Sequence, residues 1–191
     1  MEKSLEQHDS INPDCVKVVF FGPESTGKSV MAKQLSQEFS EPYVKEFSRI
    51  YAEEKQKKGL HLTKLDVMPI AAGQMALENQ QLKSAKELLI CDTDLLQTKV
   101  YSEQYYQGFC PPELTYHAFN NQYDCYFLCY IDTIWEHDGI RDRPDDREQM
   151  FEAFENALNE ADKPFIVLKG SLEEKLDSCR NKINELLKIK V

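Results

Sequence analysis

The 191-residue sequence has no long hydrophobic run, no glycine- or serine-rich linker and no signal-peptide core near its start. Its apolar stretches, such as residues 18–21, contain only a few residues, so we expect no membrane-spanning segment. The polar first ten residues indicate a cytoplasmic protein. Since no linker divides the chain, we expect a flexible tail at residues 1–14 and a single domain at residues 15–191.

The cysteines lack the spacing of a disulfide framework or a metal site. No C-x-x-C motif occurs, and Cys125 and Cys129 would lie about 13 Å apart along an expected strand. We therefore expect free thiols, as in a reducing cytoplasm. The six positions are Cys15, Cys91, Cys110, Cys125, Cys129 and Cys179.

Positive charge is scarce relative to negative charge. The chain contains 23 basic and 33 acidic residues, which gives a net charge of −10. Nucleic acids and anionic membranes are bound by concentrated positive charge, so we expect neither as a partner. A small local group of Lys and Arg facing one phosphate group remains compatible with this balance.

Short apolar runs alternate with helical patterns along the chain. This order predicts an α/β fold with a five-stranded parallel sheet covered by helices on both faces. Strands are expected at residues 16–21, 43–47, 88–91, 125–131 and 165–168. Helices are expected at residues 28–39, from about 63 or 69 to 87, at 98–107, at 112–122, after Pro144, and after a capping box at Ser171–Glu174.

Between the first expected strand and its helix, the sequence satisfies the phosphate-loop (P-loop) pattern G-x-x-x-x-G-K-[ST] in full. Glycines at both ends let the backbone N–H groups curl toward a phosphate, and the helix N-terminus adds partial positive charge. Lys28 is expected on the β- and γ-phosphates of ATP, and the Ser29 hydroxyl on Mg²⁺. The predicted nucleotide-binding residues are Gly22, Pro23, Glu24, Ser25, Thr26, Gly27, Lys28 and Ser29.

Other motifs narrow the class of P-loop protein. A GTPase needs an N-K-x-D motif to bind guanine. The Asn181-Lys182 pair is followed by Ile183-Asn184, with Asn in place of the required Asp, and it lies inside the last expected helix. A GTPase is therefore disfavoured. Motors and large ATPases need further domains. A compact small-molecule kinase fits the length best.

Two aspartates follow the third expected strand, in the run LLICDTD. Ligands of open α/β sheets bind at the carboxyl ends of the strands. Asp92 is therefore predicted to hold Mg²⁺ and to be catalytic, and Asp94 to face the acceptor. The alternative is an ordinary strand-end turn, in which Asp is common.

Glu46 and Arg49 close the second expected strand. A carboxylate within reach of an attacking hydroxyl can accept its proton or orient it, so Glu46 is predicted to be the base and Arg49 to bind the acceptor. The alternative is a surface salt bridge.

Residues 137–147 contain Arg141, Arg143 and Arg147 among four aspartates, bracketed by Gly139 and Pro144. This composition predicts a lid whose arginines, Arg141 or Arg143 at least, stabilise the charge of the transferring phosphoryl group. A solvated charged loop is the alternative. Tyr101, Tyr105, Tyr106 and Trp135 are expected to pack in the interior more readily than to stack on a ligand.

Taken together, several motifs resemble the ribosylnicotinamide kinase domain of NadR-type proteins, which belong to the P-loop AAA-type ATPases and kinases. They are GPESTGKS, KEFSR, Gly73-Gln74, CDTD, and Trp135 followed by Asp138-Gly139-Ile140-Arg141. The resemblance implies that ATP and Mg²⁺ serve to phosphorylate the 5′-hydroxyl of nicotinamide riboside, giving nicotinamide mononucleotide for NAD salvage. It also implies Glu46 and Arg49 at the acceptor, Asp92 and Asp94 at the metal and riboside, and Arg141 in the lid.

The chain departs from that family in lacking an H-x-G-H motif and the length for a second domain, so adenylyl transfer is not expected. The partner we expect is a small-molecule acceptor, and no oligomeric state is indicated. A pocket rich in carboxylates suits the pyridinium cation of nicotinamide riboside, but it also suits a neutral nucleoside. The alternatives are therefore a kinase for another nucleoside, and a P-loop ATPase or nucleotide-dependent switch without riboside kinase activity.

Overall fold

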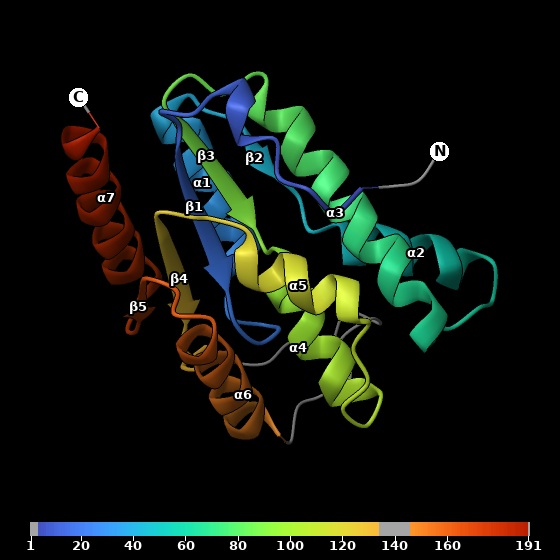
Figure 1. Ribbon diagram of the computed structural model, residues 1–191. Helices are drawn as coiled ribbons and strands as arrows, with labels where there is room; N and C mark the ends of the chain where they lie inside the picture. The colour runs from blue at the N-terminus through green and yellow to red at the C-terminus, as the bar shows by residue number, and fades with distance from the viewer. Residues whose placement is uncertain (1–3, 134–145, 191) are drawn as a thin grey trace.

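The computed structural model describes residues 4–133 and 146–190, which form an all-parallel sheet between two layers of helices (Figure 1). In these residues the sheet has five strands in the order β2-β3-β1-β4-β5. The expected α/β fold is confirmed. The strands are β1 (Val16–Phe21), β2 (Tyr43–Val44), β3 (Leu88–Asp92), β4 (Cys125–Cys129) and β5 (Phe165–Leu168).

The central strand β1 is buried along its whole length and pairs with β3 on one side and β4 on the other. Its continuous apolar run is typical of a parallel strand that is covered on both faces. Val18 and Phe20 point into one hydrophobic cluster, whereas Val19 and Phe21 point into the other. The two clusters divide the core between the two helix layers.

Helices α1 (Lys28–Phe39) and α7 (Leu172–Ile189) cover one face of the sheet. The predicted capping box starts α7, because Ser171 Oγ accepts from the Glu174 backbone N–H and Glu174 Oε2 accepts from that of Ser171. In Figure 1, α7 lies along the side of the sheet away from α3, α4 and α5.

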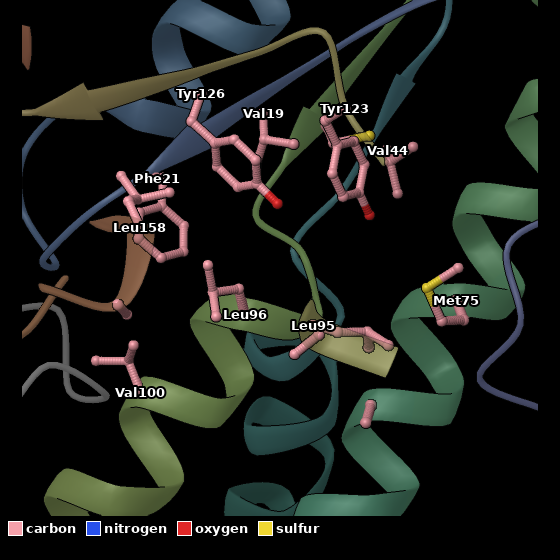
Figure 2. Close-up of a cluster of buried hydrophobic side chains, with 14 of the residues drawn as sticks. Val19, Phe21, Val44, Met75, Leu95, Leu96, Val100, Tyr123, Tyr126 and Leu158 are labelled. Atoms are coloured by element: carbon pink, nitrogen blue, oxygen red, sulfur yellow. The ribbon is translucent and has the colours of Figure 1, made fainter. Parts of the chain in front are cut away.

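The opposite face is covered by α3 (Val67–Leu82), α4 (Leu95–Tyr105), α5 (Pro112–Asn120) and α6 (Arg147–Glu160). Figure 2 shows part of this cluster, in which Tyr126 on β4 and Tyr123 just before that strand direct their hydroxyl groups toward the helix layer. The predicted capping box at Thr63 and Asp66 starts a 3-10 turn, η2 (Lys64–Asp66), that leads into α3. Helix α2 (Phe47–Lys57) was not expected from the sequence, and it has no fully buried residue that would mark an apolar face.

Residues 4–14, which were expected to form a flexible tail, pack against the rest of the structure. Leu5 is only 1% exposed, and the segment includes a short 3-10 turn, η1 (Asp9–Ile11). Gln7 Nε2 donates to Glu78 Oε1 at 2.8 Å, and the His8 backbone N–H donates to Asn79 Oδ1 at 2.9 Å, both on α3. The partners of this polar segment lie about seventy residues away in the chain, so local composition did not reveal them.

All six cysteines are free thiols, as expected. Burial raises the pKa of Cys15 to about 11 and that of Cys129 to about 12, which keeps both thiols protonated and unreactive near neutral pH. Across residues 4–133 and 146–190, none of the helices combines the length and apolar character that a membrane crossing needs.

Candidate functional site

The candidate site lies where β1, β2 and β3 end. These strands are parallel neighbours in the order β2-β3-β1, so the segments that follow them meet at one edge of the sheet. A cavity of about 520 Å³ opens there. Its walls come from the loop after β1, the start of α2, the middle of α3, α4, and residues 60–63.

The loop after β1 has the conformation that its glycines permit. Gly22 has φ 124°, and a Cβ added to it would lie 3.0 Å from the carbonyl oxygen of Cys129. Gly27 has φ 86° and forms the N-cap of α1 without a side-chain capping bond. The backbone N–H groups in the first turn of α1 therefore have no capping side chain, and an anion in the cavity can accept from them.

Lys28 is buried and holds this loop closed from the inside. Its Nζ donates to the carbonyl oxygens of Gly22 at 2.8 Å and Pro23 at 2.6 Å. Thr26 Oγ1 donates to the Pro23 carbonyl as well, at 2.8 Å. The loop thus curls around a single positive charge, the arrangement expected for a triphosphate site.

Asp92 is the last residue of β3 and is only 2% exposed. Burial and the nearby charge of Glu46 raise its pKa to about 7, whereas a hydrogen bond from Ser29 and the charges of Lys28 and Arg49 lower it. Among the described residues, Asp92 Oδ1 has no hydrogen-bond partner. Asp92 therefore lies near four residues of the predicted site, which are Ser29, Lys28, Glu46 and Arg49.

This arrangement fits a magnesium ion. Mg²⁺ prefers one or two carboxylates together with phosphate oxygens and water, and a buried carboxylate oxygen that lacks a donor beside a hydroxyl supplies the protein's share. In the two described ranges, no group of three or more His, Cys, Asp or Glu side chains forms a denser metal site. Ser29 and Asp92 are thus the residues here that suit the ion.

Glu46 follows β2 and is the N-cap residue of α2. Its carboxylate lines the cavity, and its Oε1 accepts from Ser48 Oγ at 2.7 Å. Arg49 lines the cavity too, and its Nε donates to Glu53 Oε1 at 3.3 Å within the same helix. Arg49 therefore both lines the cavity and forms the salt bridge that was considered as the alternative to a site role.

Asp94, which was predicted to bind the acceptor, lies in the core of the structure. Asp94 is fully buried and is the N-cap of α4, where Oδ1 accepts from the Gln97 backbone N–H at 3.0 Å and Oδ2 accepts from Tyr126 Oη at 2.8 Å. The physical reason is the turn at Thr93, whose φ of 78° directs Asp94 into the core instead of the cavity. Gln97 in turn accepts from the Gly22 backbone N–H through Oε1 at 3.3 Å, so Asp94 supports the P-loop from behind.

Several cavity residues were missed or given another role by sequence reasoning. Gln74 and Gln97 line the cavity, and so do Tyr101, Tyr105 and Tyr106, which were expected to pack in the interior. The spacing of Tyr101 and Tyr105 places them on one face of α4, a signal that was available once the start of that helix was known. Burial, with the charges of Glu46 and Glu24, raises the pKa of Tyr101 well above its usual range, so its hydroxyl stays neutral.

Most of the expected lid, including Arg141 and Arg143, lies outside the described residues, and so does Trp135. Arg147, the first residue of α6, is described and reaches the P-loop. Its Nη1 donates to the Thr133 carbonyl at 2.7 Å and its Nη2 to the Ser25 carbonyl at 3.4 Å, and Thr133 Oγ1 donates to the same Ser25 oxygen at 2.5 Å. Thr133 and Arg147, which flank residues 134–145, therefore both contact Ser25 of the P-loop.

The fold is similar to those of several solved kinases and related proteins. A NadR protein in complex with NR superposes with a TM-score of 0.74 at 18% identity, over 92% of this chain and 52% of that one. Deoxyadenosine kinase from M. mycoides, solved with the products dCMP and dCDP, gives 0.62 at 19% identity, over 90% and 100%. Thymidylate kinase from Candida albicans gives 0.61 at 14% identity, over 93% and 94%.

These similarities concern the fold, and the present chain spans about half the length of the NadR chain. A search of curated proteins finds no significant match to the sequence. Residues 17–175 match a family model described as an AAA domain, and since the match spans most of the 191 residues, the chain belongs to the AAA domain family.

Proposed function

We propose that this protein is an ATP- and Mg²⁺-dependent kinase that phosphorylates the primary hydroxyl of a nucleoside, and that its acceptor is nicotinamide riboside. The observation that carries the proposal is that the P-loop and Glu46 line the same cavity. Phosphoryl transfer requires a triphosphate site and an acceptor site within one enclosed space.

In this proposal, the P-loop binds the triphosphate of ATP. Lys28 exchanges the carbonyl oxygens of Gly22 and Pro23 for phosphate oxygens, which carry full negative charge and bind an ammonium more strongly. The uncapped first turn of α1 donates backbone N–H groups to the same phosphates. Both interactions strengthen as charge develops on the transferred group.

Ser29 and Asp92 would hold Mg²⁺ beside the phosphates. The ion supplies positive charge that offsets the negative charge of the phosphate oxygens during transfer. Asp92 binds a cation only when it is ionised, so its raised pKa couples metal binding to proton release.

Glu46 is assigned the acceptor hydroxyl, because it lines the cavity outside the P-loop, whereas Asp94 is buried in the core. It orients the hydroxyl and accepts its proton. Farther along the cavity wall, Tyr105, Tyr106, Leu60 and Leu62 provide apolar and aromatic surface suited to the flat ring of a nucleoside.

Two kinds of support favour nicotinamide riboside over other nucleosides. The motifs of the sequence resemble NadR-type kinase domains, and a NadR protein solved with NR shares the fold. Carboxylates beside the cavity also favour a cationic ring. We propose that the reaction serves NAD salvage in the cytoplasm.

The test is an assay of ADP release and nucleoside phosphorylation with nicotinamide riboside, deoxyadenosine, thymidine or no acceptor. We expect turnover that depends on nicotinamide riboside and on Mg²⁺. Preference for another nucleoside would reject the assigned acceptor and keep the kinase. ATP hydrolysis independent of every acceptor, or ATP binding without turnover, would reject the kinase and favour an ATPase or a nucleotide-dependent switch.

A matched pair of variants tests the role of Glu46. Glu46→Gln should lower kcat by about 10²-fold or more and leave ATP affinity unchanged, because a neutral amide cannot accept the proton. Glu54→Gln is the control, since Glu54 is exposed on the same helix. Equal kcat values for the two variants would contradict the assignment.

A further inference from the structure

One buried side chain connects the backbone next to Glu46 with the backbone next to Asp92. Gln74, in the middle of α3, is only 2% exposed. Its Oε1 accepts from the Phe47 backbone N–H at 2.8 Å, and its Nε2 donates to the Thr93 carbonyl at 3.5 Å. Phe47 directly follows Glu46, and Thr93 directly follows Asp92. The first of these bonds is the shorter and carries most of the connection.

Gly73, the residue before Gln74, also contacts Phe47. A Cβ added to Gly73 would lie 2.0 Å from Cε1 and 2.3 Å from Cδ1 of Phe47, far inside contact distance. The Phe47 ring therefore lies directly on the backbone of α3, where only glycine leaves room for it. Glycine within a helix costs about 0.5–1 kcal/mol relative to alanine, so this position places the ring at the expense of helix stability.

Beyond its first turn, α2 is anchored by hydrogen bonds from Tyr51 Oη and Lys55 Nζ to Asp66, but the start of the helix has weaker support. Strand β2 has two residues, α2 has no fully buried residue, and its N-cap residue Glu46 makes no capping bond with its side chain. The hydrogen bond from the Phe47 N–H to Gln74 is therefore the contact that fixes the backbone next to Glu46.

We propose that Gln74 is a positioning residue that holds Glu46 at a fixed distance from Asp92, and that Gly73 is required because it admits the Phe47 ring to the same contact. The inference rests on the proposed function, in which Glu46 acts on the acceptor hydroxyl. Gln74 affects the rate only through the position of Glu46. A shift of about 1 Å at a reacting group can lower a rate by about 10²-fold.

Gln74→Met tests the inference, because it keeps the length of the side chain and removes both hydrogen bonds. We expect kcat with the acceptor to fall about tenfold or more, with the KM for the acceptor and the affinity for ATP unchanged. Met75→Leu, at the next buried position of α3, is the control and should retain wild-type kcat. A rise in KM with kcat unchanged would overturn the proposal, because it would mean that Gln74 contacts the acceptor.

Two further measurements separate positioning from a general loss of stability. In the Glu46→Gln background, Gln74→Met should cause no further loss of kcat, since both changes act through one carboxylate. An equal loss in both backgrounds would overturn the proposal. Gln74→Glu keeps an acceptor for the Phe47 N–H and should retain more activity than Gln74→Met. If Gln74→Met does not fold, Gly73→Ala replaces it, with the same expected loss of kcat.

Amide hydrogen exchange at Phe47 tests the contact without any assay of activity. Exchange at this amide should be about tenfold faster in Gln74→Met than in the wild type, while amides in β1 are unaffected. Unchanged exchange at Phe47 would overturn the inference whatever the enzyme does. Faster exchange in a protein that phosphorylates no acceptor would instead reject the proposed function and leave the anchoring contact established.

Discussion

The hydroxyl of Tyr126 donates a 2.8 Å hydrogen bond to the carboxylate of Asp94, and this bond ties β4 to the start of α4. Asp94 also accepts from the Gln97 backbone N–H, and Gln97 accepts from Gly22 in the P-loop. Asp94, the second aspartate of the CDTD motif, is therefore linked from the core to the P-loop through two hydrogen bonds.

Removal of the Tyr126 hydroxyl should show this structural role. Tyr126→Phe leaves a buried Asp94 oxygen without its donor, so we expect the free energy of unfolding to fall by about 1–3 kcal/mol. The KM for the acceptor should stay unchanged. Urea unfolding and steady-state kinetics measure the two quantities. A raised acceptor KM in Asp94→Asn at unchanged stability would instead return Asp94 to the acceptor site.

The raised pKa of Asp92 predicts a dependence of stability on pH. Between the ordinary pKa of 3.8 and the folded value of about 7, the folded protein keeps a proton that the unfolded chain has lost. The contribution of Asp92 to stability is therefore full below about pH 4 and is lost as the pH rises through 7. Each pH unit in this window corresponds to about 1.4 kcal/mol at most.

Asp92→Asn removes this titration. Without Mg²⁺, the variant should gain stability relative to the wild type as the pH rises from 4 to 8, measured by urea unfolding at fixed ionic strength. Addition of Mg²⁺ at pH 8 should stabilise the wild type and leave the variant unaffected. A constant difference between the two proteins across this range would show that folding does not raise the pKa of Asp92.

Lys28 should matter for nucleotide binding far more than for folding. In Lys28→Met we expect ATP affinity to fall by about 10- to 100-fold, as befits the loss of charge-assisted hydrogen bonds to phosphate. Isothermal titration with ATP and Mg²⁺ measures this loss. Lys33→Met is the control, because Lys33 is exposed on the same helix. Equal ATP affinities for the two variants would argue against a triphosphate at this loop.

The N-terminal segment should contribute to stability. Leu5→Ala removes a side chain that is 1% exposed, and we expect the free energy of unfolding to fall by about 2 kcal/mol or more. Ile11→Ala, in the same segment but at a residue that is 42% exposed, should change it by about 0.5 kcal/mol or less. If Leu5→Ala matched Ile11→Ala, residues 4–14 would behave as the loose tail that their composition suggests.

The features predicted from the sequence are those set by neighbours in the chain. The apolar run of β1, the capping box of α7 and the complete P-loop motif each depend on residues within one or two turns of each other. The P-loop also predicted where Lys28 and Ser29 would lie, because the motif specifies the local backbone. Parallel pairing then brought Glu46 and Asp92 to the same sheet edge, as the alternation of strands and helices implied.

The sequence by itself thus determined the α/β fold and the position of the P-loop between β1 and α1. Only the tertiary structure decided that Asp94 belongs to the core, that Gln74 lies between Glu46 and Asp92, and that Leu5 is buried. Each of these outcomes depends on one backbone dihedral angle or on a partner distant in the chain. Thr93 turns the chain through a positive φ, and Gln74 bonds a residue 27 positions away. Local periodicity carries no record of such contacts, because they exist only once the sheet and its helix layers have formed.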